Sequence, residues 1–333
     1  MKILYVDLEY DYGIKARGIN TIGQYGFKYS FEKLGHEVVV FYYDEYLNNI
    51  DFLQKKIKNF ADDVKPDLIF FCMFQEQFEV KTLDYLKSKY LTINWFGDDQ
   101  WRFDNFTCKY ANCFTYCITT DKFSILKYKK LGQHNVIYSQ WGAINSHDMP
   151  KFEGYKYDVS FIGGFHPYRK WFIDTLIKRG IKVKVFGNGW MGGALSSENM
   201  NKLFILSKIN LNISNSVGYD IRYMSHKPSN FLSTIKSFLK RGSKNMSQMK
   251  ARNFEIPYFN GFQLTDYVPT LEDYFDIGKE VVCYNNVDEA ELLIKYYLQN
   301  EDEREKIKKL GHKKAINQHG YIHRFKGILE QIK

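Results

Sequence analysis

Short apolar runs that alternate with helical segments constrain the fold of this 333-residue chain more than any other feature. In its first half the runs are KILYVD (2–7), HEVVVFY (36–42), PDLIFFC (66–72), LTINWF (91–96), FTYCITT (114–120) and NVIYSQW (135–141). Segments with helical spacing lie between most of them, for example over 21–34 and 46–63. Buried strands separated by helices are typical of a parallel sheet with helices on both faces. The first half is therefore predicted to be a doubly wound α/β domain.

The same alternation restarts after the polar segment NSHDMPKFEGYK (145–156), which is predicted to be a linker. The later strands are YDVSFIGG (157–164), IKVKVFG (181–187), INLNIS (209–214), GFQLT (261–265) and KEVVCY (279–284). We expect three parts: a Rossmann-like domain over 1–150, a second over 151–318 with an insert at about 217–246, and a final helix over 319–333 that returns to the first domain. Two such domains facing a central cleft would bind ligands at the carboxyl ends of their strands.

Membrane-spanning and metal-binding functions are not expected from the composition. The longest apolar run, LIFFCMF (68–74), is too short to cross a bilayer. The first strand turns acidic at Asp7, which is unlike a signal peptide, so a cytoplasmic location is expected. Cys108, Cys113 and Cys117 lie close together but lack the paired spacing of zinc ligands, so reduced thiols and no metal site are expected.

The net charge of +9 is concentrated in one stretch, because residues 221–252 hold eight basic residues and no acidic one. A local concentration of this kind argues against a general nucleic-acid-binding surface. Within the stretch, SNFLSTIKSFLKRG has an Asn/Ser start and a Gly stop, as a helix would. The apolar face of this helix would carry Phe231, Leu232, Ile235, Phe238 and Leu239, with Lys236, Lys240 and Arg241 elsewhere. Such a helix either lies on an anionic membrane or packs on its own domain with a solvated basic rim.

Two glycine-containing turns follow strands of the second half. In SFIGGFHPYRKW (160–171), Gly163 and Gly164 allow the backbone to approach a ligand, and the following helix start with Arg169 would favour phosphate. The alternative is an ordinary strand-to-helix turn. FGNGW (186–190) ends the next strand and is by itself typical of a tight turn, and we assign its Asn188 to the same ligand-binding edge.

Three charged residues lie together in KARNFEIPYFNGFQLTDYVP (250–269). Lys250 and Arg252 could hold a diphosphate, while Glu255 could accept hydrogen bonds from ribose hydroxyls. The alternative is an ion-paired helix surface, which is the usual environment of such charges. Pro257 and Gly261 indicate that this helix is short and ends beside a strand edge.

Several motifs resemble the C-terminal half of the CgeB-like glycosyltransferases, which are similar to the GT-B, group 1 glycosyltransferases. They are R-x-F-E-I-P, G-F-x-L-T, F-x-x-G-K-E and the closing Y-x-H-R-F, and the resemblance covers most of 157–326. It implies a metal-independent, hexosyltransferase-type enzyme without a cofactor, whose nucleotide-sugar donor binds the second domain. Glu255 would then contact the ribose, Lys250 and Arg252 the diphosphate, and Gly163 and Gly164 would line the same cleft.

The resemblance also implies a hydroxyl acceptor, carried by a glycan, a lipid or a protein, bound against 1–150. One departure concerns stereochemistry. Retaining group 1 enzymes usually carry a second glutamate eight positions before the ribose-binding one, where this chain has Ser247. The sequence therefore does not choose between retention and inversion.

The first domain offers a candidate base in NWFGDDQWRF (94–103), where Asp98 and Asp99 lie between two tryptophans. Acids beside aromatic rings often hold sugars, and a carboxylate could take the proton of an acceptor hydroxyl. The alternative is an acid pair that caps the next helix, and Glu9 and Asp11 are weaker candidates. Two other functions stay open at this point: a sugar-nucleotide epimerase of the same fold, and a non-enzymatic protein that binds nucleotides or nucleic acid.

Overall fold

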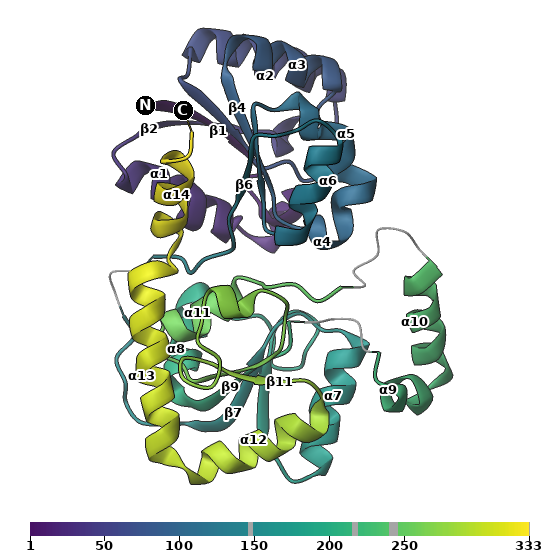
Figure 1. Ribbon diagram of the computed structural model, residues 1–333, viewed down its shortest axis with the longest axis vertical. Coiled ribbons are helices and arrows are strands. Elements are labelled where there is room, and N and C mark those ends of the chain that lie inside the picture. The colour runs from purple at the N-terminus through teal and green to yellow at the C-terminus, as the bar shows by residue number, and fades with distance from the viewer. Residues whose placement is uncertain (146–148, 215–218, 240–245, 333) are drawn as a thin grey trace. The chain divides into compact units, whose positions relative to one another are not determined.

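The computed structural model describes residues 1–145, 149–214, 219–239 and 246–332 (Figure 1). Contacts divide the chain into two compact units. Unit 1 comprises Met1–Asn145 and Tyr321–Lys333, and unit 2 comprises Ser146–Gly320. Parts of the predicted linker and insert lie outside the described residues, among them Lys240 and Arg241.

Unit 1 contains a six-stranded, wholly parallel sheet in the order β2-β1-β3-β4-β5-β6. Its strands are β1 (Lys2–Asp7), β2 (Glu37–Tyr42), β3 (Leu68–Phe71), β4 (Leu91–Phe96), β5 (Tyr116–Thr119) and β6 (Val136–Tyr138). Its helices are α1 (Tyr29–Lys33), α2 (Ile50–Val64), α3 (Val80–Lys89), α4 (Asp99–Arg102), α5 (Cys108–Tyr110), α6 (Ile125–Lys130) and α14 (Tyr321–Leu329). Two π-helical segments, η3 (Ile22–Lys28) and η5 (Phe103–Thr107), precede α1 and α5.

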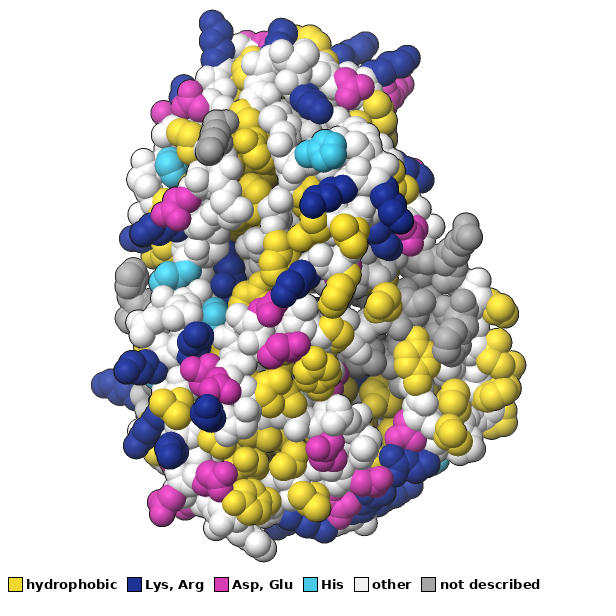
Figure 2. All heavy atoms as spheres, viewed as in Figure 1, with side chains coloured by type: hydrophobic (Ala, Val, Ile, Leu, Met, Phe, Trp, Pro, Cys, Tyr) yellow, Lys and Arg dark blue, Asp and Glu magenta, His cyan; other side chains and the backbone are white. Residues whose placement is uncertain are grey.

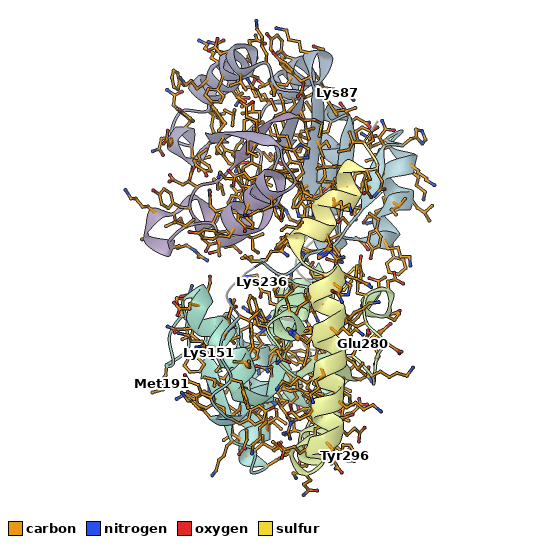
Figure 3. All side chains as sticks on the ribbon, turned by 90° about the vertical axis from the view of Figure 1, so that its left-hand side faces the viewer. Lys87, Lys151, Met191, Lys236, Glu280 and Tyr296 are labelled. Atoms are coloured by element: carbon orange, nitrogen blue, oxygen red, sulfur yellow. The ribbon has the colours of Figure 1, made fainter. Side chains whose placement is uncertain are left out.

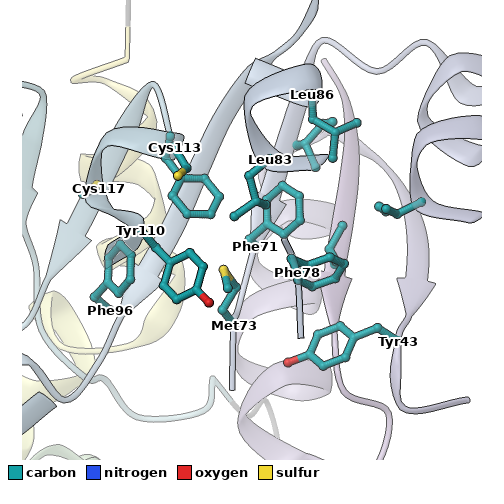
Figure 4. Packing of buried hydrophobic residues seen from close by; sticks show 14 of the residues in the cluster. Tyr43, Phe71, Met73, Phe78, Leu83, Leu86, Phe96, Tyr110, Cys113 and Cys117 are labelled. Carbon is teal, nitrogen blue, oxygen red and sulfur yellow. The ribbon is translucent and has the colours of Figure 1, made fainter. Parts of the chain in front are cut away.

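Alternating side chains of β1 show why the sheet of unit 1 has two covered faces. Leu4 and Val6 point into a core formed with α2 and α3, part of which is drawn in Figure 4. Ile3 and Tyr5 point to the opposite face, which η3, α1 and α14 cover. Both sets are fully buried, so the middle of the strand is hydrophobic on both faces, as a parallel strand covered on both faces requires.

Unit 2 repeats the architecture with a five-stranded parallel sheet in the order β11-β10-β9-β7-β8. The strands are β7 (Tyr157–Ile162), β8 (Val183–Phe186), β9 (Ser207–Asn212), β10 (Gln263–Asp266) and β11 (Val282–Tyr284). The helices are α7 (Pro167–Lys178), α8 (Ser197–Leu206), α9 (Ile221–His226), α10 (Pro228–Leu239), α11 (Arg252–Tyr258), α12 (Val287–Gln299) and α13 (Glu301–Gln318). The prediction of two doubly wound parallel domains is therefore confirmed.

Helix α13 runs along the outside of unit 2, with Tyr296 beside its first turns and Glu280 beside its middle (Figure 3). The Tyr296 hydroxyl donates to Glu303 over 2.6 Å. A Cβ atom added at Gly311 would lie 2.2 Å from the Glu280 carbonyl oxygen, so only glycine allows α13 to approach this backbone. No helix in the described part of the chain is long and apolar enough to cross a membrane.

Candidate functional site at the carboxyl edge of the second sheet

The candidate site lies where β7, β8, β9 and β10 end, which is the edge at which doubly wound folds bind ligands. Two glycine turns meet there. The backbone N–H of Gly163 donates to the Phe186 carbonyl over 3.1 Å, and the Trp190 indole donates to the Gly163 carbonyl over 2.9 Å. Gly187 has a φ of +132°, and a Cβ atom there would lie 2.0 Å from the Gly163 oxygen. The two turns are therefore in direct backbone contact.

Two other predicted residues lie in the same turns. The Asn188 carbonyl accepts a 2.8 Å hydrogen bond from the backbone of Phe165. The Asn188 side chain is exposed, and a Cβ atom at Gly164 would meet nothing within 4 Å. Gly163, Gly164 and Asn188 therefore form one open rim of backbone at the ends of β7 and β8.

Arg169 connects this rim to the end of β9. Its Nη1 donates to the Gly164 carbonyl over 2.9 Å, and its Nη2 donates to the Ser214 carbonyl over 3.4 Å. Burial lowers the pKa of the guanidinium, while the nearby Asp266 opposes that change. No ion pair within the described ranges includes Arg169. The guanidinium is thus held in place by two carbonyl groups, and Asp266 is a nearby acid that acts on its charge.

His166 begins α7 beside Arg169. Its Nδ1 accepts a 3.3 Å hydrogen bond from the backbone N–H of Tyr168 and so caps the helix. Burial, followed by the nearby Arg169, lowers the pKa of His166 to about 4. This imidazole is therefore neutral at physiological pH and serves as a helix cap.

The ion pair between Arg252 and Glu255 lies on α11. The Nη1 of Arg252 donates to the Oε2 of Glu255 over 2.8 Å, and the guanidinium lies 5.3 Å from the centre of the Phe204 ring. Glu255 is only 6% exposed, and burial raises its pKa while Arg252 lowers it. Among the side chains that the structure describes, Arg252 is the one hydrogen-bond partner of this carboxylate. The ion pair predicted as an alternative is therefore present, with Glu255 buried and Arg252 partly exposed.

A buried polar network holds the start of α11 against the strand ends. The Oδ1 of Asn253 accepts from the backbone of Lys250 over 2.9 Å and from the Ser214 hydroxyl over 3.2 Å. The Nδ2 of Asn253 donates to Thr265 over 3.2 Å, and the Oδ1 of Asp266 accepts from the Ser214 backbone over 2.8 Å. These contacts bring the backbone of Lys250 to the same edge as Arg169.

Sequence reasoning missed Ser214, Asn253, Thr265 and Asp266. The available signal was that polar residues directly follow apolar strands in NLNISNS and GFQLTD. Buried polar side chains at a strand end need partners, and a cluster of them marks the edge where loops converge.

Asp99 of unit 1 does not face an open surface. It is 1% exposed, and its carboxylate accepts from Thr107 and Thr119 over 2.6 Å each and from Tyr128 over 2.7 Å. Burial raises the pKa of Asp99 to about 6, although all three hydroxyl groups oppose the change. This environment argues against contact between Asp99 and an acceptor, because its hydrogen-bonding capacity is used within its own core.

Asp98 is partly exposed at the start of α4. Burial, followed by the nearby Asp11 and Asp98, raises the pKa of Tyr12, and burial lowers the pKa of Arg102 while Asp98 opposes that change. The two weaker candidates follow β1. Asp11 forms an exposed 2.8 Å ion pair with Arg17, and the Glu9 backbone donates to Asp44. Asp98 is therefore the member of the predicted acid pair that a ligand could reach.

Asp7, at the end of β1, is a buried acid that was not predicted as a site residue. Its carboxylate accepts from the Tyr5 hydroxyl, the Leu8 backbone and the Asn20 amide. A Cβ atom at Gly23 would lie 2.3 Å from its Oδ2, and burial raises its pKa to about 7. Asp7 fixes the start of η3 on the sheet. Within the described ranges, no three His, Cys, Asp or Glu side chains gather as metal ligands would.

Part of the chain is similar to a known protein family, and the fold is similar to that of several solved structures. Residues 169–330 match a protein family described as glycosyl transferase-like. No curated protein sequence matches the chain. Among solved structures, the fold resembles Anabaena HepE in complex with UDP-glucose, with a TM-score of 0.62, 10% identity and coverage of 99% of this chain and 98% of HepE. It also resembles sucrose-phosphate synthase from Thermosynechococcus elongatus, with a TM-score of 0.63, 8% identity and coverage of 99% and 98%. A third similar structure is AviGT4, a glycosyltransferase involved in avilamycin A biosynthesis, with a TM-score of 0.58, 12% identity and coverage of 99% and 96%.

The fold is therefore that of the GT-B glycosyltransferases, as predicted. The residues that match the family include Arg169, the α11 pair and the polar network, and they extend from unit 2 into α14 of unit 1. These findings show a GT-B fold and, over residues 169–330, similarity to a glycosyl transferase-like family.

Proposed function

We propose that the protein transfers a sugar from a nucleotide-sugar donor, bound by unit 2, to a hydroxyl acceptor bound by unit 1. The observation that carries the proposal is the Arg169 guanidinium at the strand ends. Two carbonyl groups fix its position, and no acid in the described part of unit 2 pairs with it. A fixed planar cation of this kind is suited to a diphosphate, whose negative charge it would contact directly.

The α11 pair supports the same donor. A buried carboxylate with one partner retains acceptor capacity, and the hydroxyl groups of a ribose would use it. Arg252 lies close enough to Arg169 to lower its pKa, so the two cations belong to one electrostatic environment. The solved structure of HepE, similar in fold, contains UDP-glucose.

During transfer the acceptor oxygen would bond to the anomeric carbon as the bond to the diphosphate breaks. The proton of the acceptor hydroxyl needs a base, and we assign that role to Asp98 because Asp99 is enclosed. Arg169, Lys250 and Arg252 would stabilise the negative charge that develops on the departing diphosphate. Cations of the chain itself would therefore replace a metal, and we propose a metal-independent hexosyltransferase that needs no cofactor.

The proposal extends to location and acceptor. We place the protein in the cytoplasm, in peripheral contact with the inner face of an anionic membrane, with a glycan or lipid-linked acceptor. The cationic stretch over 221–252 supports membrane contact and, being local, argues against nucleic acid as the partner.

The donor assignment is tested with Glu255→Gln, which keeps the shape and removes the charge. Calorimetric titration with a panel of nucleoside diphosphates and nucleotide sugars first identifies the donor. The substitution should then weaken donor binding about 10- to 150-fold, the equivalent of a charged hydrogen bond of about 1.5–3 kcal/mol. Asp276→Asn is the matched control, because Asp276 forms an exposed i,i+3 ion pair with Lys279 before β11. Equal donor affinity in Glu255→Gln and the parent protein would refute the ribose assignment.

The same preparation separates the alternative functions. A transferase releases nucleoside diphosphate in the presence of acceptor, whereas an epimerase yields an isomeric nucleotide sugar and no free nucleotide. A nucleic-acid-binding protein would instead bind DNA or RNA with an affinity that falls steeply with salt.

A further inference from the structure

Helices α9 and α10 form a hairpin that stands away from the sheet of unit 2 (Figure 1). The hairpin has its own internal contact: the Asn230 amide donates to the Tyr223 carbonyl over 3.1 Å. Among the described elements, α10 packs mainly against α9. Most of the surface of α10 is therefore free to meet a partner.

The amphipathic pattern of α10 is inverted relative to an ordinary surface helix. Asn230 and Thr234, one helical turn apart, are 7% and 4% exposed, whereas Leu232 and Leu239 are 64% and 81% exposed. Phe231, Ile235 and, from α9, Ile221 are also exposed. Figure 2 shows hydrophobic side chains gathered over α10. In contrast, α2 buries Leu53 and Ile57 completely, which is the usual arrangement.

Cations predominate among the charged residues around this apolar surface. Arg222 is neutralised by Asp220 and Asp288, with N–O distances of 2.7 and 2.6 Å. Lys227 and Lys236 have no ion-pair partner among the residues that the structure describes. No acidic residue occurs anywhere in 221–252. Large exposed apolar patches mark interaction sites, and this one is bordered by cations.

We infer that the α9–α10 surface, defined by Ile221, Phe231, Leu232, Ile235, Leu239, Lys227 and Lys236, docks onto a membrane that contains anionic lipids. The apolar side chains would enter the boundary between headgroups and acyl chains, and the lysines would meet lipid phosphates. A second copy of the chain fits less well, because it would bring Lys227 and Lys236 of the two copies against like charges. The inference rests on the proposed function and adds to the transferase a membrane-docking surface that lies outside its donor site.

The test is co-sedimentation of the full chain with vesicles of phosphatidylcholine alone or mixed with phosphatidylglycerol, at low and high salt. The protein should sediment with the anionic vesicles at low salt and be released at high salt. Replacing Lys227 and Lys236 by glutamate should weaken binding at least about 25-fold, since each cation near such a surface contributes about fivefold.

The apolar contribution is tested with Leu232→Ser combined with Leu239→Ser, which should abolish vesicle binding. Both side chains are exposed, so the melting temperature should be unchanged. Leu292→Ser is the matched control, because Leu292 on α12 is 66% exposed and lies outside the surface. Donor binding, measured separately by titration, should be the same in all these variants.

Three results would overturn the inference. The first is an intact protein that stays in the supernatant under all four conditions. The second is a Leu232/Leu239 variant that binds vesicles as well as the parent does. The third is a lipid-free dimer, seen by analytical ultracentrifugation, that the same double substitution dissociates, since this would identify a second copy as the occupant. None of these results would bear on the donor site.

Discussion

Asp99→Asn should make the stability of the protein less dependent on pH. The pKa of about 6 lies about 2 pH units above the ordinary value of 3.8, so the folded protein binds a proton more tightly than the unfolded chain. The contribution of Asp99 to the free energy of unfolding is therefore fully present below pH 3.8 and is lost progressively as the pH rises to about 6. Each pH unit corresponds to about 1.4 kcal/mol, so ionising Asp99 costs the folded state about 3 kcal/mol.

The measurement is the free energy of unfolding of the parent protein and of Asp99→Asn, from urea denaturation between pH 4 and pH 7. The variant can satisfy the three hydroxyl groups but cannot ionise. Between these pH values the parent should lose about 2–3 kcal/mol relative to the variant. The contribution of Asp7, whose pKa is also raised, is present in both proteins and cancels in the comparison.

Two controls complete this experiment. Asp104→Asn changes an exposed acid of the same segment, paired with Lys127 at 3.2 Å, and should follow the parent at every pH. Sugar transfer should survive Asp99→Asn and fall with Asp98→Asn. If the free energies of unfolding of the parent and of Asp99→Asn change with pH in the same way, the argument from burial is refuted. If sugar transfer is lost with Asp99→Asn and not with Asp98→Asn, Asp99 is the catalytic residue.

Two further predictions concern unit 2. Lys250→Ala should lower the turnover number more than the affinity for the donor, because the lysine ammonium would stabilise charge that develops during transfer. Steady-state kinetic constants equal to those of the parent protein would show that Lys250 is only a surface charge. Gly187→Ala should reduce the free energy of unfolding by more than about 2 kcal/mol, because the added Cβ would meet the Gly163 oxygen. Gly180→Ala is the control and should cost about 1 kcal/mol, because Gly180 has a φ of +87° but a Cβ there would meet no atom within 4 Å. Equal losses in urea denaturation would contradict the close contact.

The fold was predictable because its central strands are buried on both faces. PDLIFFC predicts a strand, and β3 (Leu68–Phe71) lies within it, fully buried. The strand predicted at KEVVCY is shorter in the structure, where only Val282–Tyr284 pair as β11. Its first residues belong to a turn instead: Lys279 pairs with Asp276, and Glu280 accepts from the Asp276 backbone. The two charged residues at the start of KEVVCY were the sequence signal that the strand begins later.

The sequence alone did not reveal that Asp98 is accessible while its neighbour Asp99 is enclosed. Adjacent residues point in different directions, and the partners of Asp99 come from η5, β5 and α6, far apart in the chain. No local pattern reports such contacts. The π-helical form of η3 was equally hidden, because Asp7 and Asn20 hold its start from outside the segment.

The packing of α14 has a consequence for the order in which the chain can fold. Phe325 lies against Phe27 and Phe31, with ring centres 5.0 and 4.6 Å apart, and the Tyr321 backbone donates to the Ala143 carbonyl. Unit 1 therefore draws its core from both ends of the sequence, and unit 2 is contiguous between them. During synthesis unit 2 is complete before the ribosome has supplied the last layer of unit 1. Unit 1 is thus begun first and completed last, and the face of its sheet that η3 and α1 cover stays partly exposed until α14 is made.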